Sequence, residues 1–65
     1  MKRYVMELAA DRKRDMRDAY RFAAEHDNEE AKQYASEELE RIDSILQQCK
    51  YGYICEYEAV RLLMK

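Results

Sequence analysis

Apolar positions in the first part of the chain recur in steps of three and four, the spacing of one face of an α-helix. They are Val5, Leu8, Ala9, Met16, Ala19, Tyr20 and Ala23. This spacing predicts a helix over about residues 2–25. Arg12 interrupts the stripe, because its position falls on the same face.

A second run with helical spacing covers about residues 28–50 and is more regular. Its apolar members are Ala31, Tyr34, Ala35, Leu39, Ile42, Ile45, Leu46 and Cys49. We expect Asp27 to be the N-cap of this helix, with Glu30 three residues later as in an acidic capping box. A turn as short as His26-Asp27-Asn28 makes consecutive helices antiparallel. The two runs therefore predict an antiparallel helical hairpin.

Gly52 is the expected left-handed residue that ends the second helix. A third, shorter helix is predicted over about residues 55–64, with Cys55 at the position of a capping serine in a Gly-x-Ile-Ser-x-x-Glu pattern. Residues 51–57 are rich in β-formers, so an extended conformation there is the alternative. The predicted fold class is all-α: a single small domain, residues 1–65, made of an antiparallel hairpin and a short third C-terminal helix.

Composition agrees with a folded helical domain. The 65 residues include no proline and one glycine, and 40 % of them are charged while 48 % are hydrophobic. So small a domain has a marginal core and usually needs a disulfide, a metal or a second chain. Two cysteines and one histidine fit no disulfide framework or metal-ligand spacing, so we expect no cofactor and no metal.

Charge divides unevenly along the chain. Residues 1–24 carry seven basic and four acidic side chains, whereas residues 25–47 carry two and eight. One flank of the first helix is basic, and its members are Arg3, Arg14, Arg17 and Arg21. This flank predicts, as one alternative, a nucleic-acid-binding module that contacts phosphates. The acidic second helix suggests another alternative, a phosphate mimic that inhibits a nucleic-acid-binding protein. We expect instead that the second helix neutralises the basic flank within the molecule.

Arg12 needs a partner if it lies within the apolar stripe, because burying an unpaired guanidinium is costly. Glu38 lies at the edge of the facing stripe, about one turn from Ile42. We therefore expect Arg12 and Glu38 to form a structural ion pair across the hairpin.

The third helix has apolar side chains on nearly all sides, and two helices can cover only one of its faces. We expect the remainder to form an interface, made by Tyr53, Tyr57, Val60, Leu63 and Met64.

The sequence contains no arrangement that indicates a catalytic site, since His26 has no evident nucleophile or orienting group beside it. The predicted function is a cytoplasmic, non-catalytic protein-interaction or regulatory module that binds a protein partner or itself. We expect no membrane and no small-molecule substrate.

Overall fold

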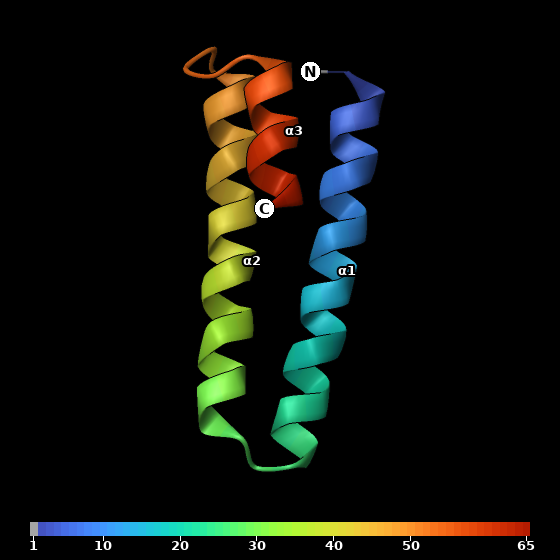
Figure 1. Ribbon diagram of the computed structural model, residues 1–65, viewed down its shortest axis with the longest axis vertical. Coiled ribbons are helices and arrows are strands. Elements are labelled where there is room, and N and C mark those ends of the chain that lie inside the picture. Colours follow the sequence, from blue (N-terminus) through green and yellow to red (C-terminus); the bar gives the residue numbers. More distant parts are fainter. Residues whose placement is uncertain (1) are drawn as a thin grey trace.

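The computed structural model describes residues 2–65, which form three α-helices and no strand (Figure 1). They are α1 (Arg3–Glu25), α2 (Glu29–Lys50) and α3 (Glu56–Met64). Helices α1 and α2 are antiparallel and pack along most of their length. Helix α3 is much shorter and lies against both of them at the end where α1 begins and α2 ends. The predicted all-α hairpin with a third C-terminal helix is confirmed.

Each helix begins one residue later than the sequence predicts, because the expected first residue is the N-cap in all three cases. The Asn28 side chain accepts a hydrogen bond from the backbone N–H of Ala31, at 3.1 Å. The Cys55 thiol accepts one from the N–H of Glu58, at 3.4 Å, as expected for a residue in the place of a capping serine.

The turn between α1 and α2 corrects the expectation that Asp27 is the N-cap of α2. Asp27 instead adopts the left-handed conformation, with φ of 54°. The N–H of Asp27 donates to the carbonyl of Ala24 at 3.3 Å, and that of Asn28 donates to Ala23 at 2.9 Å. These two bonds form the Schellman motif that ends α1. Asp27 therefore belongs to the end of α1, and Asn28 is the N-cap of α2.

The second helix ends in the same motif. Gly52 has φ of 85°, its N–H donates to the Cys49 carbonyl at 3.2 Å, and the N–H of Tyr53 donates to Gln48 at 2.8 Å. Glycine takes this conformation without the steric cost that a Cβ atom brings. The link from α2 to α3 is therefore a tight turn followed by a cap, and the extended alternative for residues 51–57 is wrong.

The core is small and wholly aliphatic. One cluster joins the three helices through Val5, Ala9, Ile42, Ile45, Ala59 and Leu63. Ala23 and Ala35 are buried in the other half of the hairpin, beyond the reach of α3. Four of these eight buried side chains are alanine, which lets the helices approach closely but buries little apolar area per residue.

Candidate protein-interaction surface

Every aromatic side chain of the protein lies on its surface. The six tyrosines are between 40 % and 79 % exposed, and the single phenylalanine, Phe22, is 64 % exposed. Aromatic side chains usually supply much of the apolar area of a small core. Tyrosine is also enriched at the centres of protein–protein interfaces. This distribution places the largest apolar side chains where a partner can reach them.

Four of the tyrosines lie at one end of the molecule. Tyr4 is in the first turn of α1, Tyr51 and Tyr53 are in the link between α2 and α3, and Tyr57 is in the first turn of α3. These segments lie together at the end where the chain starts (Figure 1). We call this set of four residues the tyrosine end.

The structure divides the predicted interface residues into two groups. Tyr53, Tyr57 and Met64 are 79 %, 74 % and 66 % exposed, and Val60 is half-buried. Leu63 is fully buried in the core cluster, so its assignment to an interface is wrong.

The other predicted interface residues on α3 lie on one outer side of the helix. Tyr57, Val60 and Met64 follow one another at three- and four-residue steps and therefore share one face of the helix. Leu63 lies on the inward side, where it packs with Ala59. We call Tyr57, Val60 and Met64 the α3 strip.

The molecule exposes more surface than a compact protein of its mass. Its accessible surface is 5044 Å². The empirical scaling for folded monomers gives about 4,400 Å² for a chain of 7.9 kDa. The excess follows from the elongated shape, 39 × 18 × 16 Å, because α3 covers only part of the hairpin.

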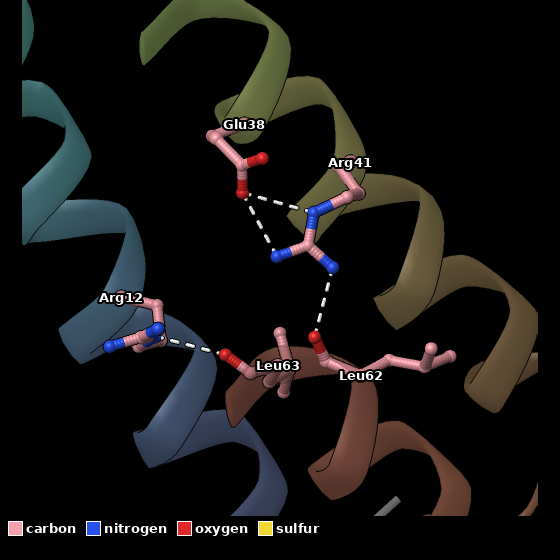
Figure 2. A network of polar contacts seen from close by, with 5 residues as sticks. All are labelled: Arg12, Glu38, Arg41, Leu62 and Leu63. Atoms are coloured by element: carbon pink, nitrogen blue, oxygen red, sulfur yellow. Dashed lines mark hydrogen bonds and ion pairs between the residues drawn. The ribbon is translucent and has the colours of Figure 1, made fainter. Parts of the chain in front are cut away.

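Arg12 is bound differently from the expectation. Its Nε donates a hydrogen bond to the backbone carbonyl of Leu63 at 2.9 Å, and no ion pair joins it to Glu38 within residues 2–65 (Figure 2). The carboxylate of Glu38 accepts instead from Arg41, from Nε at 3.0 Å and Nη2 at 2.9 Å. The predicted Arg12–Glu38 ion pair is therefore wrong. The reason is that α3 ends between the two helices and offers Arg12 a carbonyl that periodicity alone does not reveal.

Arg41 completes this arrangement from the other side. Its Nη1 donates to the carbonyl of Leu62 at 2.9 Å while Glu38 holds the rest of the guanidinium (Figure 2). The last carbonyls of a helix lack partners within the helix and carry partial negative charge. Arg12 and Arg41, which we call the arginine clasp, satisfy two of them from separate helices. Sequence reasoning missed Arg41, whose only signal is its i,i+3 spacing from Glu38.

The basic flank of α1 is solvated and only partly paired. Arg3 contacts Glu7 at 2.8 Å and Arg14 contacts Asp11 at 3.2 Å, both within α1. Exposed pairs of this kind contribute little to stability. The flank therefore does not hold the hairpin together.

Among the residues that the structure describes, α2 forms no ion pair with any of the four arginines of this flank. Within residues 2–65, the pair from Lys13 Nζ to Asp43, 2.7 Å long, is the one ion pair that joins α1 to α2. In the same part of the chain no carboxylate lies within 4.0 Å of the guanidinium of Arg17 or Arg21. The expectation that α2 neutralises the basic flank is therefore wrong for direct ion pairs, because the carboxylate of α2 that pairs with α1 contacts Lys13, which lies outside the flank.

Residues 2–65 contain no group of three or more His, Cys, Asp or Glu side chains that could hold a metal ion. Over the same residues, no helix has the length and apolar character to cross a membrane. His26, in the turn between α1 and α2, contacts Phe22 of α1, with ring centroids 4.2 Å apart and ring planes tilted by 47°. Comparison of the chain with protein-family models, with curated proteins and with solved structures finds no match.

Proposed function

We propose that this protein is a non-catalytic interaction module that acts by occupying the surface of a protein partner, and that a second copy of the chain is such a partner. The observation that carries the proposal is the exposure of all seven aromatic side chains above a core made only of Ala, Val, Ile and Leu. These residues supply contact area rather than proton transfer or nucleophilic attack.

Self-association is supported by the size of the core and the position of the α3 strip. Within residues 2–65, Ile42, Leu63 and Val5 are the only large side chains that are fully buried. A core of this size rarely yields more than about 3–5 kcal/mol, so added burial at an interface has a large effect on stability. A twofold axis beside α3 lets the same strip of each copy cover the other, which is the commonest symmetry of small oligomers.

The test is the mass of the assembly in solution, measured by sedimentation velocity over a range of micromolar concentrations. The expected mass is twice that of the 7.9 kDa chain. Tyr57→Glu in the α3 strip is expected to shift the protein to monomer without loss of helicity, because Tyr57 is 74 % exposed. Tyr34→Glu is the matched control, since Tyr34 is 60 % exposed but lies on α2 towards the opposite end. A monomer at every concentration, or equal effects of the two variants, would contradict self-association.

A reducing compartment such as the cytoplasm suits this function. Cys49 and Cys55 are both free, and Cys55 uses its thiol as a helix cap. Disulfides are rare where thiols are kept reduced, so the free thiols favour this setting.

A second candidate function is phosphate binding along the basic flank of α1. The observation in its favour is that Arg17 and Arg21 have no carboxylate within 4.0 Å in residues 2–65. The net charge of −2 acts against it. Affinity for duplex DNA, followed by fluorescence anisotropy, should fall steeply with salt if phosphates are bound. Arg17→Gln together with Arg21→Gln should then reduce both the affinity and the salt slope.

A further inference from the structure

A second surface, separate from the α3 strip, lies between α1 and α2. It is an open groove of about 500 Å³, lined by Met6, Ala9, Ala10, Lys13, Leu46, Gln47 and Lys50. No lining residue comes from α3. The groove exists because alanines stand on α1 where larger side chains would fill the space between the helices.

The lining residues of each helix have helical spacing, and most of those on α1 are apolar. On α1, Met6, Ala10 and Lys13 follow one another at four and three residues, and on α2, Leu46 precedes Lys50 by four. The α1 side of the groove from residue 6 to residue 13 therefore spans about 10 Å, close to two turns of a helix. Met6 is 58 % exposed, so its side chain is accessible to a ligand. These dimensions suit the apolar face of a short helix laid into a groove.

The borders of the groove are positively charged. Lys50 stands where α2 ends, and its Nζ lies 5.9 Å from the centroid of the Tyr51 ring. Arg17 follows Lys13 by one turn on the same strip of α1. Within residues 2–65 neither Lys50 nor Arg17 has a carboxylate within 4.0 Å, whereas Lys13 is paired with Asp43. A ligand in the groove therefore meets positive charge without an ion-pair partner from Lys50 within the lining, and again from Arg17 one turn beyond Lys13.

From this combination we infer that the groove binds an amphipathic helix of another protein, with an apolar face on Met6 and Leu46 and acidic side chains towards Lys50 and Arg17. Phosphates of a nucleic acid would leave the apolar lining unused, so the apolar lining favours an acidic helix over DNA or RNA. Complementary charge would set the orientation of the bound helix and speed its association.

The inference can be tested with a synthetic probe and the full chain. The probe is a fluorescently labelled amphipathic peptide with leucines at i, i+3, i+4 and i+7 and glutamates on both flanks of that stripe. Binding is followed by anisotropy, and the site by amide shifts of the isotope-labelled protein. We expect saturable binding that shifts the amides of Ala9, Ala10 and Gln47 most. A matched peptide with lysine in place of every glutamate should bind at least about tenfold more weakly.

Variants of the protein separate the groove from general electrostatic attraction. Ala10→Leu fills the groove with a strong helix former at an exposed position, so the fold is retained and affinity should fall by about tenfold or more. Lys50→Gln should weaken binding several-fold, whereas Lys32→Gln, the charge-matched control near the start of α2 and outside the groove, should not. Absence of peptide binding, or equal binding to wild type and Ala10→Leu, would overturn the inference. Shifts at the same amides produced by duplex DNA and abolished by Arg21→Gln would also overturn it. Because the groove contains no part of α3, these results are independent of the assembly mass measured for the proposed function.

Discussion

Arg12 and Leu63, 51 positions apart in sequence, are joined by a hydrogen bond from the arginine Nε to the leucine carbonyl, 2.9 Å long. The bond ties the middle of α1 to the last turn of α3 (Figure 2). The Leu63 side chain meanwhile packs in the core. The end of α3 is thus held both by apolar packing and by the arginine clasp.

Arg12→Met is expected to lower the free energy of unfolding by about 1–2 kcal/mol, because it leaves a helix-terminal carbonyl without a charged donor. Chemical denaturation followed by circular dichroism measures the effect. Arg14→Met is the control, since Arg14 is exposed and its pair with Asp11 should contribute less than about 1 kcal/mol. Equal losses of unfolding free energy in the two variants would show that the arginine clasp does not stabilise the fold.

A double-mutant cycle distinguishes the observed contacts from the ion pair that the sequence suggests. Glu38→Gln and Arg41→Met should be coupled by at least about 0.5 kcal/mol, because these side chains share two short contacts. Glu38→Gln and Arg12→Met should be nearly additive. A larger coupling in the second cycle than in the first would restore the Arg12–Glu38 pair and contradict the clasp.

The two Schellman motifs predict opposite effects of two substitutions. Asp27→Gly should raise the free energy of unfolding by about 0.5–1 kcal/mol, because it relieves a left-handed conformation that costs a residue with a Cβ atom. Gly52→Ala should lower it by about 1 kcal/mol for the same reason. A Cβ at Gly52 would meet no atom within 4 Å, so the loss of stability would come from the left-handed backbone conformation and not from a steric clash with neighbouring groups. Thermal and urea denaturation measure both variants, and a stabilising Gly52→Ala would refute the explanation.

Leu63 and Met64 are neighbours with opposite environments, and their substitutions should differ accordingly. Leu63→Ala is expected to cost about 3 kcal/mol, most of the stability of so small a domain, because Leu63 is fully buried. Met64→Ala should change stability by less than about 0.5 kcal/mol, since Met64 is 66 % exposed. Urea denaturation at a concentration where both proteins are monomeric makes the comparison. Comparable losses of stability in the two variants would contradict the placement of Leu63 in the core and Met64 on the surface.

Hydrophobic periodicity was sufficient to predict the three helices and their order, because the apolar residues of α1 and α2 recur at helical spacing. It overestimated how much of each stripe is buried, since Tyr20 and Tyr34 are exposed. Periodicity could not predict which side of α3 faces the core, because the apolar residues of this helix lie on most of its sides. It therefore could not distinguish the buried Leu63 from the exposed Met64. Asp27 and Asn28 are both good capping residues, and the choice between them depends on how α1 ends. The partner of Arg12 was beyond sequence reasoning because it is a backbone carbonyl, placed by the packing of α3.

The direct test of the central claim, that the exposed aromatic surface contacts another copy, is an isotope-filtered NOE experiment on mixed labelled and unlabelled protein. Cross-peaks between copies report only intermolecular contacts. The account predicts them from the ring protons of Tyr57 and the methyl groups of Val60 and Met64, and their loss in Tyr57→Glu but not in Tyr34→Glu. Absence of intermolecular cross-peaks at the highest attainable concentration, or cross-peaks confined to surfaces outside the α3 strip and the tyrosine end, would contradict it.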